Sequence, residues 1–417
     1  MGINSQISRL QTNINWAIQA LEEKGVSFES YERNSSSLYE KIYQMVGGYP
    51  NGTSWETDYR QGGVFIKCMH YANNLFVAGD ENYGLYYSED GKSWSQSNIT
   101  SGNITYLTFE HLTWFAYDSS NNVILYSTDG KNWQSIYDVE TYDIYKIIYR
   151  RNIYVAGTYN GVYYSSDGIT WTKANIYNTC SQYLEYVGGL FVVGGNDGIY
   201  HSVDGINWEQ GKNSEVSYIT YEPESDLIVV GFYDGYIYTH QYDPDGNLMY
   251  NWSWDDIGQI SSSRIDSIHY ANGMWVASTS DGIYYSTDMN YWSQSNITYT
   301  RFDIIDNIDG LWIAYSQYDS NGIYYSTDGM YWQSSYISYG SFSKVIKDSG
   351  IWIAASVSNN GIYYSSDGID WKRTNITSGS YYDILHNNGI WTAGSYGVYD
   401  WSLARFIYSV TWENSNS

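Results

Sequence analysis

Apolar and polar residues alternate over short stretches that recur along most of the chain. One stretch reads CMHYANNLFVAG, in which two apolar runs flank an Asn-Asn pair, and IIYRRNIYVAG, LEYVGGLFVVG, SIHYANGMWVA and VIKDSGIWIAA repeat the arrangement. Two alternating runs joined by two or three turn residues are typical of a β-hairpin. The pattern therefore predicts a chain built mainly from short antiparallel strands.

A second motif, G-I-Y-Y-S-x-D-G-x-x-W, follows most of these hairpins. It reads GVYYSSDGITW from Gly161 to Trp171, Met289 replaces its second glycine in one copy, and the copy before Trp254 is badly degraded. A repeat of this length is typical of four short strands that form one propeller blade. The motif tryptophans, which are 37 to 46 residues apart, are Trp94, Trp133, Trp171, Trp208, Trp254, Trp292, Trp332 and Trp371.

The S-x-D-G segment predicts a tight turn between the last two strands of each unit. Ser and Asp oxygens can accept backbone N–H groups within such a turn, Gly can adopt a positive φ, and the Trp ring can cover the end of the hairpin. We therefore expect a structural role for the motif aspartates and no catalysis. These aspartates are Asp90, Asp129, Asp167, Asp204, Asp288, Asp328 and Asp367.

The number of units depends on how the last one is completed. Nine hairpins can be counted, and the ninth, YDILHNNGIWTAGSYGVYDW, lacks a motif of its own. Either the segment from Asn51 to Trp55, which copies the end of the motif, or FIYSVTW, which ends at Trp412, could complete it. We predict an all-β fold, a single β-propeller of nine four-stranded blades over residues 51–417. Eight blades is the alternative, because propellers usually have four to eight.

Residues 1–50 follow a different pattern. Apolar residues at alternating spacings of four and three predict a helix with a heptad seam, and a second helical pattern follows in LYEKIYQMVGG. Such a helix either packs against its own propeller or joins copies of the chain. We expect an α-helical assembly segment and a homo-oligomer, with a seam formed by Ile3, Ile7, Leu10, Ile14 and Leu21.

Charge and composition exclude several classes of function. The chain has 45 acidic and 20 basic residues and a net charge of −25, which argues against binding to nucleic acid or to an anionic membrane surface. No run approaches the 18 apolar residues of a membrane span, and the N-terminus has no signal-peptide pattern. Two cysteines, Cys68 and Cys180, are too few for a disulfide framework.

Residues suited to catalysis or metal binding are scattered. No H-x-x-x-H or C-x-x-C pair occurs, so we expect no metal site and no cofactor. The segment Asp243–Asn247 resembles the front of a calcium loop, but it lacks the downstream Glu and favours a plain turn. Three arginines from different blades, Arg60, Arg264 and Arg301, are the set that could converge at the axis of the ring in an enzyme.

The aromatic residues point to a different chemistry. The chain has 50 tyrosines and 18 tryptophans. Most are expected to pack between blades, but exposed Tyr and Trp rings beside Asn, Asp and Ser suit stacking on sugar rings. A saccharide-binding surface somewhere on the ring is therefore one hypothesis.

The S-x-D-G-x-x-W motif resembles a one-residue-shorter form of the Asp-box of sialidase-like β-propellers. The resemblance covers about residues 51–412 and implies the propeller fold; in that family the box lies at the periphery, so no catalytic role is implied for it. A sialidase also needs an arginine cluster, a Tyr nucleophile with a Glu partner and an acidic general acid. No arginine here lies in the family's Phe-Arg-Ile-Pro context.

The N-terminal segment has a resemblance of its own. Its pattern I-x-x-L-x-x-x-I-x-x-A, followed by a polar linker and L-x-x-x-I, is similar to attachment segments of bacteriophage tail and virion proteins. Together the resemblances imply a non-enzymatic virion protein that is attached to other virion or tail proteins through residues 1–50. Its ring would bind a host-surface glycan or serve as a rigid adaptor. A sialidase-like glycoside hydrolase is the alternative.

Overall fold

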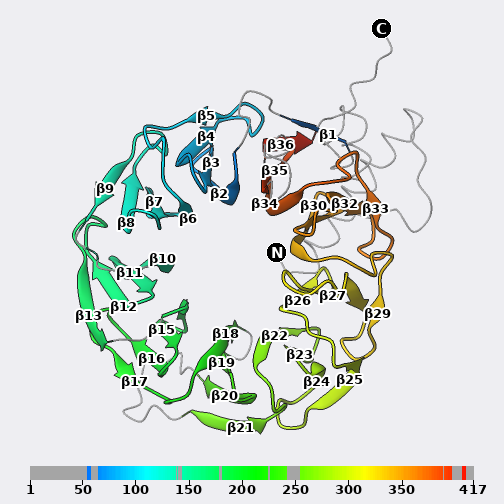
Figure 1. Cartoon of the computed structure of the whole chain (residues 1–417). Coiled ribbons are helices and arrows are strands. Elements are labelled where there is room, and N and C mark those ends of the chain that lie inside the picture. Colours follow the sequence, from blue (N-terminus) through cyan, green and yellow to red (C-terminus); the bar gives the residue numbers. More distant parts are fainter. Residues whose placement is uncertain are drawn as a thin grey trace, which may run out of the picture.

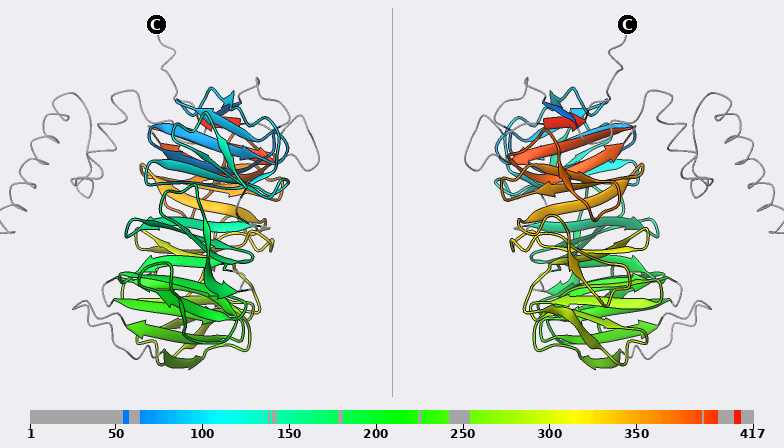
Figure 2. Two further views of the ribbon diagram at one scale, coloured as in Figure 1. Left: turned by 90° about the vertical axis from the view of Figure 1, so that its left-hand side faces the viewer. Right: turned by 90° about the vertical axis from the view of Figure 1, so that its right-hand side faces the viewer.

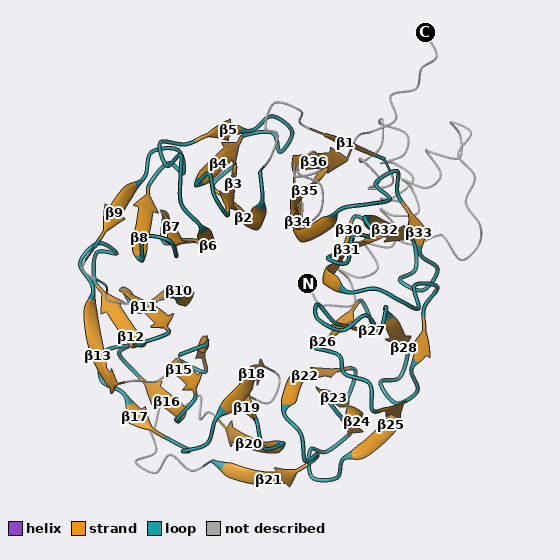
Figure 3. Cartoon of the chain, in the orientation of Figure 1, coloured by secondary structure: helices purple, strands orange, loops and turns teal. Residues whose placement is uncertain are grey.

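The computed structural model describes residues 54–57, 64–137, 139, 143–177, 181–223, 226–241, 254–387, 389–396 and 406–409. These residues form nine four-stranded antiparallel sheets around a common axis (Figure 1). Strands and loops account for all of the described part, which contains no helix (Figure 3). Seen edge-on, the blades lie in a single layer (Figure 2). The prediction of nine four-stranded blades is confirmed, and the alternative of eight is wrong.

The strands run outward from the axis in chain order in every blade except the ninth, whose outermost strand is the first strand of the described chain. The innermost strands are β2 (Ile66–Ala72), β6 (Ile104–Glu110), β10 (Ile144–Arg150), β14 (Tyr183–Val187), β18 (Val216–Glu222), β22 (Ile265–Ala271), β26 (Ile304–Ile308), β30 (Phe342–Asp348) and β34 (Ser380–Asn387). The second strands are β3 (Leu75–Asp80), β7 (Thr113–Asp118), β11 (Ile153–Thr158), β15 (Leu190–Gly195), β19 (Leu227–Phe232), β23 (Met274–Thr279), β27 (Leu311–Tyr315), β31 (Ile351–Ser356) and β35 (Ile390–Tyr396).

The motif supplies the outer half of every blade except the ninth, although its copy before Trp254 is degraded. The third strands are β4 (Leu85–Ser88), β8 (Val123–Ser127), β12 (Gly161–Ser165), β16 (Gly198–Ser202), β20 (Tyr236–Gln241), β24 (Gly282–Ser286), β28 (Tyr324–Ser326), β32 (Ile362–Ser365) and β36 (Phe406–Ser409). The outermost strands are β5 (Ser95–Gln96), β9 (Gln134–Ile136), β13 (Thr172–Tyr177), β17 (Glu209–Gln210), β21 (Asp255–Gln259), β25 (Ser293–Thr298), β29 (Gln333–Ser334), β33 (Lys372–Arg373) and β1 (Trp55–Thr57). We number the blades 1 to 9 by their innermost strands, from β2 to β34.

The inner hairpins turn where the sequence pattern predicts. Asn73 and Asn74, between β2 and β3, have φ angles of 50° and 58°. Two successive residues with positive φ define the turn whose twist matches that of paired strands, and Asn tolerates this conformation better than most residues. The Asn, Gly and Asp residues between the apolar runs therefore fix the hairpins locally.

The hydrophobic core lies between blades as well as within them. Phe115 and Tyr117 of β7 pack in one buried cluster with Ile147 of β10 and Ala156 of β11. Neighbouring blades approach so closely that a Cβ atom on Gly79 of β3 would lie 2.5 Å from Ile104 Cγ2 of blade 2. Packing at this density couples each blade to the next, so the ring is stabilised as a whole.

Blade 9 closes the ring by combining three strands from the C-terminal part of the chain, β34 to β36, with β1 from the N-terminal part. β1 pairs with β36, with Trp55 opposite Ser409 and Thr57 opposite Ile407. The sequence treated the two segments as alternatives, but the structure uses both, because FIYS forms the third strand and Trp55 begins the fourth. Trp412 lies outside the described residues.

Residues 1–50, with the expected helices and the seam residues Ile3, Ile7, Leu10, Ile14 and Leu21, also lie outside the described residues. No helix long and apolar enough to cross a membrane occurs in the part of the chain that the structure describes.

Candidate functional site

The motif turns are closed by their own side chains. In blade 3, Ser165 Oγ donates a hydrogen bond to Asp167 Oδ1 (2.9 Å), which also accepts the N–H groups of Ile169 (2.8 Å) and Thr170 (2.7 Å). The hydrogen bonds from Thr170, Ile169 and Ser165 lower the pKa of Asp167 to about 2. A carboxylate that is ionised and engaged in its own turn is poorly suited to act as a general acid. The same Ser–Asp and Asp–backbone hydrogen bonds occur at Asp90, Asp129, Asp204, Asp288, Asp328 and Asp367.

The motif tryptophans are anchored to the same turns. The indole N–H of Trp171 donates to the carbonyl of Gly168 (3.1 Å), and the ring is buried. Trp94 instead stacks on Phe406 of blade 9, with ring centroids 3.9 Å apart. Equivalent indole hydrogen bonds, to the residue three positions earlier, are made by Trp133, Trp208, Trp292, Trp332 and Trp371.

Among the described residues, an asparagine joins the outer edges of neighbouring blades at four seams. Asn98, four residues after Trp94, donates its amide N–H to the Trp133 carbonyl (2.9 Å) and accepts the Trp133 N–H (2.8 Å). We call this pair of hydrogen bonds the Asn clip. The other clips join Asn175 to Trp208, Asn296 to Trp332 and Asn375 to Trp55.

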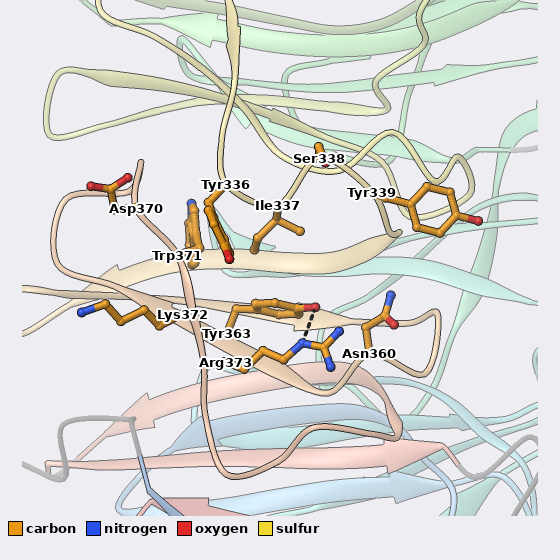
Figure 4. Close-up of a pocket in the computed structure, with 10 residues that line it drawn as sticks. All are labelled: Tyr336, Ile337, Ser338, Tyr339, Asn360, Tyr363, Asp370, Trp371, Lys372 and Arg373. Carbon is orange, nitrogen blue, oxygen red and sulfur yellow. Dashed lines mark hydrogen bonds between the residues drawn. The ribbon is translucent and has the colours of Figure 1, made fainter.

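A tyrosine replaces the clip asparagine at the seam between blades 7 and 8. Tyr336 lies four residues after Trp332, the position of the clip asparagine in other blades, and its N–H donates to the Ile369 carbonyl at 3.5 Å. A pocket of about 840 Å³ is present here, which we call the rim pocket. It is lined by Tyr336, Ile337, Ser338, Tyr339, Asn360, Tyr363, Asp370, Trp371, Lys372 and Arg373 (Figure 4).

The rim pocket combines exposed aromatic rings with polar side chains. Tyr336 and Tyr339, from the loop after β29, are 80% and 72% exposed. Tyr363 of β32 is buried; Arg373 of β33 lies over its ring at 5.4 Å and donates from Nε to its hydroxyl at 3.1 Å (Figure 4). This contact fixes the guanidinium, while the two exposed tyrosines remain accessible to a ligand.

Two of the three arginines singled out in the sequence converge. Arg264 and Arg301 both contact Asp266, whose side chain is 1% exposed, at 2.5 Å and 3.1 Å. Arg301 also lies 3.0 Å from Asp303, and the hydrogen bond to Asp266 raises the pKa of Arg301. Both cations are therefore neutralised by the protein's own carboxylates. Arg60 lies outside the described residues.

Histidines and acidic residues do not assemble into a metal site within the described ranges, where no group of three or more potential ligands converges. His70 of β2 and His269 of β22 belong to blades 1 and 6, and burial lowers the pKa of both. His269 Nε2 is 2.9 Å from the hydroxyl of Tyr218. Cys180 and the segment Asp243–Asn247 lie outside the described residues.

The sequence left the position of any saccharide site open. Two positions at which the sequence differs from the other repeats could have indicated the rim pocket. Tyr336 replaces the clip asparagine, and Arg373 stands two residues after its motif tryptophan, where three other blades have Gln96, Gln210 and Gln294. The two positions are brought together only by the packing of one blade against the next.

Known structures resemble this chain in fold. A computationally designed protein, Ika8, is 12% identical over 84% of this chain and 98% of its own, with a TM-score of 0.51. BamB from Moraxella catarrhalis (11% identity, 73% of this chain and 96% of its own, TM-score 0.47) and an ancestral GH74 enzyme (14% identity, 84% and 60%, TM-score 0.42) are more distant. The sequence matches no protein-family model and no curated protein.

The chain is a nine-bladed β-propeller. Because the identities are so low and the fold is shared by proteins of unrelated function, the similarity shows the fold alone.

Proposed function

We propose that this protein is a non-catalytic saccharide-binding propeller and that the rim pocket is its binding site. The observation that carries the proposal is the exposed pair Tyr336 and Tyr339 beside Asn360, Asp370 and Arg373 in one pocket. Tyrosine faces stack on the C–H faces of sugar rings, and amide, carboxylate and guanidinium groups hydrogen-bond to sugar hydroxyls. A volume of about 840 Å³ is within the usual range for small-ligand sites.

The local structure explains why the pocket lies at this seam. An Asn clip would tie the backbone of Trp371 to blade 7, as Asn375 ties that of Trp55 to blade 8. Tyr336 cannot form the clip, because a phenol has no carbonyl oxygen and amide N–H pair. Replacing a clip asparagine with an exposed tyrosine removes two hydrogen bonds between the blades. A role of the tyrosine in saccharide binding would explain why this loss is tolerated.

A glycoside hydrolase of sialidase type is the second candidate, since Arg264 and Arg301 lie together. The contacts with Asp266 favour a structural role for this pair. An arginine cluster that binds a substrate carboxylate needs free guanidinium groups, and here the buried Asp266 bridges both cations. The motif aspartates are likewise engaged in their own turns. Binding without turnover agrees best with these contacts.

The proposed setting is a virion or bacteriophage tail appendage. This part of the proposal rests on the heptad pattern of residues 1–50 and its resemblance to virion attachment segments. Several rings attached to one particle would raise the overall affinity for a host surface well above that of a single weak site. A rigid adaptor that binds no glycan would need no exposed tyrosines in the rim pocket.

Saccharide-array binding by the full-length protein tests the proposal, followed by a turnover assay on each bound saccharide. We expect binding that is reduced about tenfold or more by Tyr336→Ala or Tyr339→Ala, with no product formed. Tyr291→Ala is the matched control, because Tyr291 is 82% exposed but does not line the pocket. Turnover that survives both pocket variants would favour the hydrolase instead.

A further inference from the structure

Arg373 of the rim pocket stands at a position where three other blades have a glutamine. Gln96, Gln210 and Gln294 stand two residues after their motif tryptophans, and each donates its amide N–H to a loop carbonyl of its own blade, at 2.8 to 2.9 Å. At this register Arg373 lies opposite Tyr363 on the neighbouring strand. The guanidinium thus replaces a neutral group that three blades use for structure.

Arg373 lacks a carboxylate partner among the described residues. Arg150, Arg264 and Arg301 each lie within 4 Å of a carboxylate, and the hydrogen bond of Arg373 goes to the Tyr363 hydroxyl. That bond uses Nε and leaves both Nη groups free for a ligand. Arg151 is the other described arginine without a carboxylate within 4 Å, and its Nε likewise donates to a tyrosine hydroxyl, that of Tyr186; Arg373 differs from it in lining the rim pocket.

The charges that line the pocket sum to a positive value. Lys372 and Arg373 contribute two positive charges, and Asp370 contributes one negative charge. A guanidinium held by stacking can pair with a carboxylate, sulfate or phosphate through two parallel hydrogen bonds. Its attachment to Tyr363 reduces the entropy lost when such a pair forms.

The seam between blades 2 and 3 also has a tyrosine in place of the clip asparagine and a cation in place of the glutamine. Tyr137, four residues after Trp133, is 78% exposed, and in the next blade Lys173 lies over the ring of Tyr163 at 5.9 Å. The four seams with an Asn clip lack a cation at this register of the following blade, which instead has Ser135, Gln210, Ser334 or Thr57. Tyrosine and cation therefore occur together in these two seams, whereas Tyr59, four residues after Trp55 in the sequence, is followed in the next blade by Gln96.

We infer that the rim pocket takes an anionic saccharide, whose acidic group pairs with Arg373 while its ring stacks on the exposed tyrosines. The inference rests on the proposed saccharide-binding function and adds the chemical class of the ligand. Neutral saccharides would leave the guanidinium without a charged partner in the pocket. The Tyr137–Lys173 seam offers a weaker version of the same chemistry, because an ammonium group cannot form the planar bidentate pair.

The test is an array of neutral, carboxylated, sulfated and phosphorylated saccharides probed with the full-length protein and two variants. Arg373→Gln introduces the residue that three other blades carry at this register, so the fold should be retained; a melting curve checks this. Lys92→Gln removes the same charge in blade 1, outside the pocket. We expect the acidic saccharides to bind, Arg373→Gln to weaken them about tenfold or more, and Lys92→Gln to leave them unchanged.

A change in the ligand tests the inference without a protein variant. The best-bound saccharide is compared with the same saccharide after its acidic groups are removed or reduced to alcohols, and affinity should fall by a similar factor. Equal binding of the neutral form, or equal losses from both protein variants, would overturn the inference and leave saccharide binding standing. If the wild-type protein binds none of these saccharides, the proposed function itself fails.

Discussion

Asn375 in blade 8 and Trp55 in blade 9 are 320 residues apart in the sequence and exchange two hydrogen bonds of 2.8 Å. The Asn375 amide N–H donates to the Trp55 carbonyl, and the Trp55 N–H donates to the Asn375 amide oxygen. The same clip joins blades that follow one another directly in the chain, as at Asn296 and Trp332. Ring closure thus uses the standard contact of the repeat, supplied by an N-terminal strand.

Asn375→Ala should lower the free energy of unfolding by about 1–3 kcal/mol, because it leaves the partly buried N–H and C=O groups of Trp55 without their hydrogen-bond partners. Chemical denaturation followed by tryptophan fluorescence measures the change. Asn296→Ala is the matched control, since it removes the same two hydrogen bonds at an internal seam. If neither variant loses stability, the clip contributes nothing and its absence beside the rim pocket has no structural consequence.

Removal of β1 should have a larger effect than any clip variant. A chain that begins at residue 51 keeps Trp55–Thr57 and is expected to melt as the full-length protein does. A chain that begins at residue 58 exposes the edge of β36, so we expect a lower melting temperature and self-association through that edge. Equal melting temperatures for the two truncated chains would contradict closure through β1.

The motif aspartates should make stability depend on acid pH. Their pKa values are lowered in the fold, to about 2 for Asp167 and Asp204, whereas the unfolded value is about 3.9. A lowered pKa contributes stability above the unfolded value that is lost as the pH falls through the folded value, so stability should decrease between about pH 4 and pH 2. Melting temperatures measured across this pH range test the effect. In Asp167→Asn the melting temperature should depend less steeply on pH than in the wild-type protein.

Asp266 is expected to be structural. Asp266→Asn leaves Arg264 and Arg301 without their shared buried carboxylate; because both arginines are about one-third exposed and Arg301 keeps Asp303, we expect a loss of about 1–3 kcal/mol. Unfolding measurements should show this loss, while saccharide affinity of the folded fraction is unchanged. Loss of a hydrolytic activity with unchanged stability would instead indicate that the arginine pair belongs to a catalytic site.

The sequence predicts the ring well because its determinants are local. Asn73 and Asn74 set a hairpin, and Ser165 with Asp167 sets a motif turn, without help from distant residues. The sequence does not determine how the ring closes, because Trp55 and Phe406–Ser409 become neighbours only when blade 9 forms. The sequence does not locate the rim pocket for the same reason, since Tyr336 and Arg373 meet across a seam between two blades.

The affinity of the best array saccharide for three forms of the protein tests the central claim most directly. Isothermal titration should show that the wild-type protein and Tyr291→Ala bind alike, and that Tyr336→Ala binds about tenfold or more weakly while melting at the same temperature. Equal affinity of Tyr336→Ala and the wild-type protein would contradict a saccharide site in the rim pocket.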